Sequence, residues 1–102
     1  MVKKKLRPIV WDNDARLYFK AAIGYIKKES VQGAKKVKAE IFKTVELLPE
    51  NPQLFEIDKL KTGNDGSYRA FIVYHYRITY KITADSIQII RMRHTSQEPL
   101  EH

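Results

Sequence analysis

Apolar side chains recur at helical spacing in two adjacent segments of the first half of the chain. The first segment, predicted as a helix over residues 13–29, carries a stripe made of Tyr18, Ala21, Ala22, Tyr25 and Ile26. The second begins at Ser30 as an N-cap, and its buried positions are Ala34, Val37, Ile41, Val45 and Leu48. Pro49 and Pro52 end this second helix. Because almost no linker separates the segments, they are predicted to form an antiparallel hairpin.

One glycine interrupts the first helical pattern. Gly24 costs about 1 kcal/mol relative to alanine inside a helix, so we expect it to let a neighbouring element approach closely. Burial of the stripe predicts that Tyr25 packs with Ile41, Val45 and Ile78 in one core.

The second half of the chain changes to the alternation typical of strands. Runs that begin at Ser67, Tyr76 and Ile87 follow one another, separated by short turn sequences. In the middle run, Tyr76, Ile78, Tyr80 and Ile82 fall on one side, while Arg77, Thr79 and Lys81 fall on the other. A further short strand is predicted at residues 9–11, and residues 49–66 form a loop that ends in a dense turn signal. The predicted fold is α+β: an N-terminal strand, an antiparallel helical hairpin, then a three-stranded antiparallel meander.

Composition limits the class of protein. The chain has 102 residues, with 43% hydrophobic and 30% charged residues, which suits one folded domain. Residues 1–99 are expected to form that domain, and residues 100–102 resemble the start of a vector-encoded tag. A net charge of +7 favours polyanionic partners, although a solvated basic surface is the alternative. The absence of cysteine and of a long apolar segment fits a cytoplasmic protein without a membrane partner.

The polar positions of the meander are mostly cationic. RNA can be cleaved by its own 2′-hydroxyl if a protein supplies a base, an acid and cations for the phosphorane, so no metal or other cofactor is required. Arg77 is expected to stabilise the phosphate, with Arg69 beside it, and His94 to transfer the proton. Further support for RNA binding is expected from Arg91, Arg93, Lys81 and Lys61.

Each of these residues also has a structural interpretation. Arg77 could face solvent beside Lys81, and Arg91 or Arg93 could pair with Glu98 or a helix acid. His94 could be held by hydrogen bonds near the chain end, and His75 lies in a predicted turn. Three tyrosines, Tyr74, Tyr76 and Tyr80, could stack on bases or pack in the core.

The chain resembles the RelE/ParE superfamily of toxins from type II toxin–antitoxin modules over residues 8–99. The resemblance rests on the order of elements and on short matching stretches: residues 9–11, 25–26, 29–30, 48–52, 68–69, 76–80 and 91–94, with Ala34, Val37 and Ile41. It implies a β-α-α-β-β-β fold and an antitoxin partner, usually acidic where it wraps the toxin. By the same resemblance, Arg77 matches the arginine that RelE-like enzymes use on the scissile phosphate. Arg69, Arg91, Arg93 and His94 match their second basic cluster.

The resemblance leaves the molecular target open. RelE-like members cut mRNA on the ribosome, whereas ParE-like members inhibit DNA gyrase. Several RelE-like nucleases carry a functional tyrosine near the C-terminus, and residues 95–99 contain none. Four arginines and a histidine in the meander favour a metal-independent mRNA endoribonuclease that arrests growth until the antitoxin neutralises it. A gyrase inhibitor without nuclease activity is the alternative, and a non-toxic binding module is the third.

Overall fold

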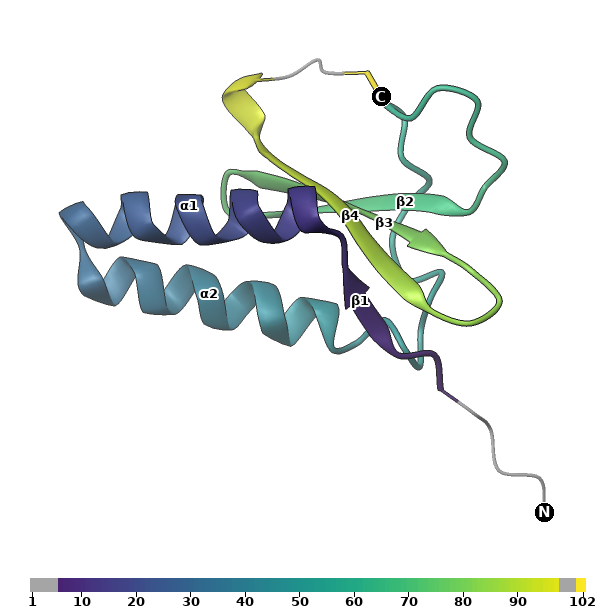
Figure 1. Ribbon diagram of the computed structural model, residues 1–102, viewed down its shortest axis with the longest axis horizontal. Coiled ribbons are helices and arrows are strands. Elements are labelled where there is room, and N and C mark those ends of the chain that lie inside the picture. The colour runs from purple at the N-terminus through teal and green to yellow at the C-terminus, as the bar shows by residue number, and fades with distance from the viewer. Residues whose placement is uncertain (1–5, 98–100) are drawn as a thin grey trace.

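The computed structural model describes residues 6–97 and 101–102. Its elements follow the predicted β-α-α-β-β-β order and form an α+β fold (Figure 1). They are β1 (Ile9–Trp11), α1 (Asn13–Glu29), α2 (Val31–Val45), β2 (Tyr68–Val73), β3 (Tyr76–Ile82), β4 (Ile87–His94) and the short 3₁₀ turn η1 (Thr95–Gln97). The predicted bounds of the first helix are confirmed.

All four strands belong to one sheet in the order β1-β4-β3-β2. The meander β2-β3-β4 is antiparallel, as predicted, whereas β1 pairs with β4 in the parallel sense. The β2–β3 turn is tight, and Tyr74 within it has a φ of 55°. In this order β1 forms one edge of the sheet next to β4, so β4 is an internal strand. The alternation pattern does not reveal this arrangement, since it reports faces of strands and not their order.

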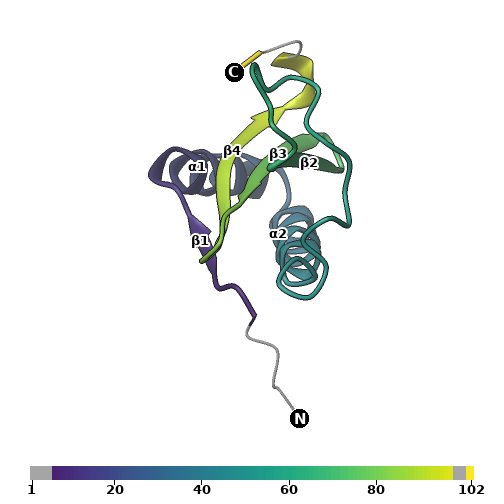
Figure 2. The ribbon, with the colours of Figure 1, turned by 90° about the vertical axis from the view of Figure 1, so that its right-hand side faces the viewer.

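The two helices form an antiparallel pair that covers one face of the sheet (Figures 1 and 2). Ser30 ends α1 and caps α2, because its hydroxyl accepts a 2.8 Å hydrogen bond from the Gly33 N–H. The core between the layers contains Ile41, Val45 and Ile78, as predicted. It also contains Tyr76 and Tyr80, so these two rings are core residues.

Two predictions about α1 are wrong. Tyr25 is 66% exposed and does not join the core. A Cβ built on Gly24 would meet no atom within 4 Å, so this glycine does not serve a close approach. The helical hairpin extends past the end of the strands (Figure 1), and in the second half of the apolar stripe Ala22 and Ile26 pack against the core whereas Tyr25 does not.

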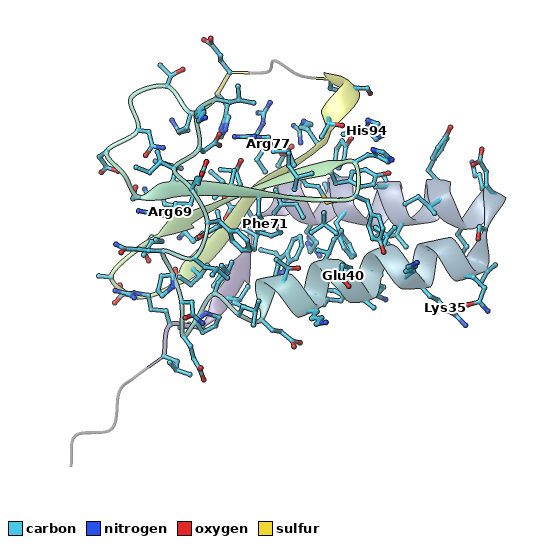
Figure 3. All side chains as sticks on the ribbon, turned by 180° about the vertical axis from the view of Figure 1, so that it is seen from behind. Lys35, Glu40, Arg69, Phe71, Arg77 and His94 are labelled. Atoms are coloured by element: carbon cyan, nitrogen blue, oxygen red, sulfur yellow. The ribbon has the colours of Figure 1, made fainter. Side chains whose placement is uncertain are left out.

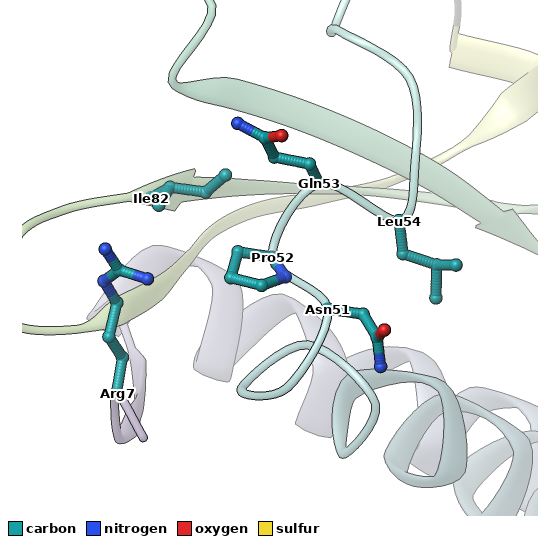
Figure 4. Close-up of a pocket in the computed structure, with 6 residues that line it drawn as sticks. All are labelled: Arg7, Asn51, Pro52, Gln53, Leu54 and Ile82. Carbon is teal, nitrogen blue, oxygen red and sulfur yellow. The ribbon is translucent and has the colours of Figure 1, made fainter. Parts of the chain in front are cut away.

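The long connection between α2 and β2 follows the outer edge of β2 (Figure 2). The Ala70 N–H donates to the Glu56 carbonyl at 3.1 Å, and the Asp58 N–H donates to the Tyr68 carbonyl at 2.9 Å. Nearer α2, residues 51–54 line a hollow of about 450 Å³ together with Arg7 and Ile82 (Figure 4). The predicted turn follows, with Gly63 and Gly66 at φ of 66° and 98°.

Candidate functional site

The strand register decides which predicted site residues share a face, because directly opposed residues of an antiparallel pair point to the same side. Ile78 opposes Met92 and Phe71, all three of which are in the core, so this row marks the helix face of the sheet. Arg69 opposes Tyr80, and His94 opposes Tyr76, which places both on the helix face. The other side, called the outer face below, carries Arg77, Lys81, Arg91 and Arg93.

Arg77 is held by a buried carboxylate. Asp58, from the α2–β2 connection, has a side chain that is 0% exposed, and its Oδ1 lies 2.6 Å from the Arg77 guanidinium. The same oxygen accepts from the Leu60 N–H, while Oδ2 accepts from the Thr79 hydroxyl at 2.8 Å. The Nε2 atom of His102 also lies 2.8 Å from Oδ2. Arg77 is only 20% exposed, so it does not simply face solvent.

The pKa of Asp58 reflects this environment. Burial alone would raise it, but the hydrogen bonds from Arg77, the Leu60 N–H, Thr79 and His102 outweigh burial and lower the pKa to about 2. Asp58 is therefore ionised at neutral pH, and its hydrogen bonds hold the α2–β2 connection against β3. Sequence reasoning missed this residue, since a single aspartate in a loop carries no periodic signal. The cue that could have found it is the presence of two polar side chains, Arg77 and Thr79, two residues apart on the outer face of β3.

Arg91 and Arg93 differ in their surroundings. Arg93 pairs with Asp14 of α1 at 3.2 Å and lies over the Tyr18 ring at 5.1 Å, so the predicted pairing with a helix acid is confirmed. Arg91 has no hydrogen bond or ion pair within the described residues. Burial and the neighbouring charge of Arg93 lower the pKa of Arg91, although it stays a cation at neutral pH. Arg91 is therefore the outer-face guanidinium best placed to receive an anion.

Two lysines extend the outer face toward the start of β2. The ammonium groups of Lys61 and Lys81 lie 4.7 and 5.2 Å from the centre of the Tyr68 ring. Lys61 also donates to the Thr62 carbonyl at 2.9 Å. The ammonium groups of both lysines therefore lie against the same aromatic ring. The structure brings together Lys61, Lys81, Arg77 and Arg91 as members of a single cationic surface.

Arg69 is separated from that surface. Its guanidinium donates to the Phe55 carbonyl at 2.8 Å, beneath the α2–β2 connection. The Tyr80 hydroxyl donates nearby to the Pro52 carbonyl at 2.7 Å, and burial raises the pKa of this phenol. In Figure 3, Arg69 lies near one end of the meander and His94 near the other. Arg69 thus fixes the connection onto the sheet from the helix side.

His94 is held near the chain end by hydrogen bonds, as its structural interpretation expected. Its Nδ1 lies 3.1 Å from the Ser96 N–H and 2.8 Å from the Ser96 hydroxyl. A backbone N–H can only donate, so Nδ1 accepts and the neutral ring carries its proton on Nε2. The ring also stacks on His75 at 5.9 Å and meets the edge of Tyr76 at 5.3 Å. In this tautomer Nε2 is a hydrogen-bond donor.

The described residues, 6–97 and 101–102, contain no group of three His, Cys, Asp or Glu side chains able to hold a metal ion. Within that same part of the chain, no helix is both long and apolar enough to cross a membrane.

Comparisons with known proteins identify relatives of this chain. The family model described as "ParE toxin of type II toxin-antitoxin system, parDE" matches residues 9–99. A chain of the chromosomal ParDE toxin–antitoxin system from P. aeruginosa is similar in structure, with a TM-score of 0.66 and 15% identity over 87% of this chain and 96% of that one. The YoeB dimer from Staphylococcus aureus is similar with a TM-score of 0.59 and 20% identity over 88% of this chain and 98% of its own. No curated protein sequence matches.

Proposed function

The chain belongs to the ParE toxin family of type II toxin–antitoxin systems, and we propose that it arrests growth by binding DNA gyrase rather than by cutting mRNA. Membership in this family implies an antitoxin partner. The finer proposal concerns the target. ParE-like members of the superfamily inhibit gyrase, and the matched family model spans almost the whole domain, residues 9–99.

One observation favours gyrase over mRNA as the target: the groups that RNA cleavage would need together lie on opposite faces of the sheet. Arg77 is on the outer face and is bonded to Asp58, whereas Arg69 and His94 are on the helix face. A base must lie within hydrogen-bond reach of the proton it removes, so a phosphate held by Arg77 would lack His94 as its partner. Inhibition through protein contact requires no such convergence.

Ribosome-dependent mRNA cleavage is the second candidate. Arg91 favours it, because residues 6–97 and 101–102 provide no hydrogen-bond or ion-pair partner for its guanidinium. This guanidinium, with Lys81 on the same face, offers cations to a phosphate backbone. Catalytic hydrogen bonds often tighten only once substrate is bound, so the nuclease hypothesis predicts a rearrangement that brings His94 toward the outer face.

Two assays, one on the purified protein and one on cells that express it, separate these candidates. Titration of the toxin into a gyrase supercoiling reaction should abolish supercoiling, and addition of the antitoxin should restore it. Primer extension on mRNA from expressing cells should show no new 5′ ends. Cleaved mRNA together with unimpaired supercoiling would overturn the gyrase proposal.

A histidine variant gives the genetic counterpart. His94→Gln should retain growth arrest if the toxin acts on gyrase, because glutamine still offers a hydrogen-bond donor at this position. Under the nuclease hypothesis it should lower cleavage by about 10²-fold or more, since glutamine cannot transfer a proton near neutrality. His75→Gln is the matched control, because His75 is the stacked neighbour of His94 in the β2–β3 turn.

A further inference from the structure

A groove lies on the helix side of the sheet, between α1 and the end of the sheet where β3 begins and β4 ends. It has a volume of about 470 Å³, and its walls include Tyr18, Tyr25 and Glu29 of α1 with Tyr76 and His94 of the sheet. The groove follows part of the α1 stripe, where Ala21 and Ala22 leave room between the tyrosines. We call it the tyrosine groove. It plays no part in the function proposed above.

The charge of the tyrosine groove is opposite to that of the protein as a whole. Of the described residues that line it, Glu29 is the only acid, and none is lysine or arginine. Glu29 has no ion pair within the described part of the chain. The chain carries a net charge of +7, so a lone carboxylate among tyrosine rings marks a local preference for a cation.

Three tyrosines, Tyr18, Tyr25 and Tyr76, line the same groove. Burial raises the pKa of Tyr76, and the adjacent Tyr18 and Tyr25 raise it further. Tyrosine rings present a negative face to a cation, and several rings around one site add their attraction. The groove thus combines three tyrosine side chains and one carboxylate in its lining.

The same helix already holds a guanidinium in this way. Asp14 and Tyr18 lie one helical turn apart on α1, and Arg93 pairs with the carboxylate at 3.2 Å while it stacks over the ring at 5.1 Å. Tyr25 and Glu29 lie at the same four-residue spacing farther along α1. The first pair is occupied by an arginine of this chain, and the second pair faces the groove.

We propose that the tyrosine groove binds an arginine side chain of a protein partner, with the guanidinium stacked on Tyr25 and paired with Glu29. Guanidinium suits the site better than ammonium, because a planar group can stack on a ring and bond a carboxylate in two places at once. Buried arginine and tyrosine contacts are also the ones that most often dominate the binding energy of protein interfaces. The inference does not depend on whether the toxin acts on gyrase or on mRNA.

A small probe tests the site on the intact protein. Nα-acetyl-arginine amide should shift the ring resonances of Tyr18, Tyr25 and Tyr76 saturably, with a Kd on the order of millimolar. Nα-acetyl-citrulline amide has nearly the same shape without the charge, and should bind at least about 3-fold more weakly. Equal shifts from the two probes, or no saturable shift from the arginine probe, would overturn the proposal.

Two variants locate the binding. Glu29→Gln should weaken the arginine probe by about 3-fold and Tyr25→Leu by a similar factor, since each removes one of the two contacts. Both residues are exposed, so the variants should keep the fold, which amide spectra of each variant will verify. Glu50→Gln is the matched control, because Glu50 is an exposed acid that does not line the groove. An unchanged affinity in Glu29→Gln, or an equal loss in Glu50→Gln, contradicts the assignment.

Discussion

At the scale of single residues, the structure gives Arg77 a partner that the sequence did not indicate, the carboxylate of Asp58. Alternation correctly placed Arg77 and Thr79 away from the helical core, but it treated that side as open to solvent. The structure covers it with Asp58, a side chain that is 0% exposed. An arginine on the outer face can therefore be structural, and its loss would affect folding as well as any contact with a target.

Asp58→Asn should destabilise the protein by about 3–5 kcal/mol, because it removes the buried carboxylate that bonds the partly buried guanidinium of Arg77. A denaturant titration measures this difference. Asp85→Asn, an exposed aspartate in the β3–β4 turn, should stay within about 0.5 kcal/mol of the unmodified protein. Arg77→Ala should also destabilise strongly, so any loss of toxicity in that variant must be compared with its folded fraction. Comparable stability of Asp58→Asn and Asp85→Asn would show that the ion pair contributes little.

The lowered pKa of Asp58 also predicts a pH dependence. The folded-state pKa is about 2 and the ordinary value is 3.8, so the folded state binds this proton less readily than the unfolded chain does. The contribution, about 2 kcal/mol, is present above pH 4 and is lost as the pH falls toward 2. Unfolding free energies measured across this range should converge for the unmodified protein and Asp58→Asn. Parallel curves would contradict the shift.

At the scale of elements, periodicity located both helices and the whole meander, because helical and strand spacing each leave a distinct mark on the sequence. Two features of the fold could not be predicted from periodicity. The parallel pairing of β1 with β4 depends on contacts between residues far apart in the chain, such as Ile9 and Ile87. The exposure of Tyr25 depends on where the sheet ends, which the α1 sequence does not record. The grouping of the candidate site residues met a related limit: they were grouped by charge, and the register puts Arg69 and His94 on the other face from Arg77.

The two glycines within helices, Gly24 and Gly33, differ in the space available for an added Cβ. Gly24→Ala should stabilise the protein by about 0.5–1 kcal/mol, because a Cβ there meets no atom within 4 Å and alanine is the better helix former. At Gly33, a Cβ would lie 3.1 Å from the Ser30 hydroxyl that caps α2. Gly33→Ala should therefore gain less or lose stability. Thermal unfolding of the two variants decides the matter, and an equal gain at both sites would mean that the cap tolerates the added methyl group.

At the scale of the whole molecule, charge is distributed unevenly over a basic chain. Arg77, Lys81 and Arg91 make the outer face cationic. Among the residues that the structure describes, the acid that lines the tyrosine groove on the helix side is Glu29. A partner that uses the outer face should be acidic, and one that uses the groove should present an arginine. The two surfaces are on opposite sides of the sheet, so the antitoxin and a second protein could be bound by different chemistry.

If an acidic segment of the antitoxin covers the outer face, the affinity of the complex should fall steeply as salt rises. Carboxylate–cation contacts on an exposed surface are screened over about 10 Å at 0.1 M salt and over about 3 Å at 1 M. Binding of the cognate antitoxin, measured between 0.05 and 0.5 M salt, should therefore weaken as salt rises, and the double variant Lys61→Gln/Lys81→Gln should flatten that dependence.

Lys35→Gln is the matched control, because Lys35 is an exposed lysine on α2, away from the meander in Figure 3. An affinity that does not change with salt would exclude the outer face as the antitoxin contact. The same conclusion would follow if the Lys35 variant flattened the curve as much as the double variant, since the effect would then come from net charge alone.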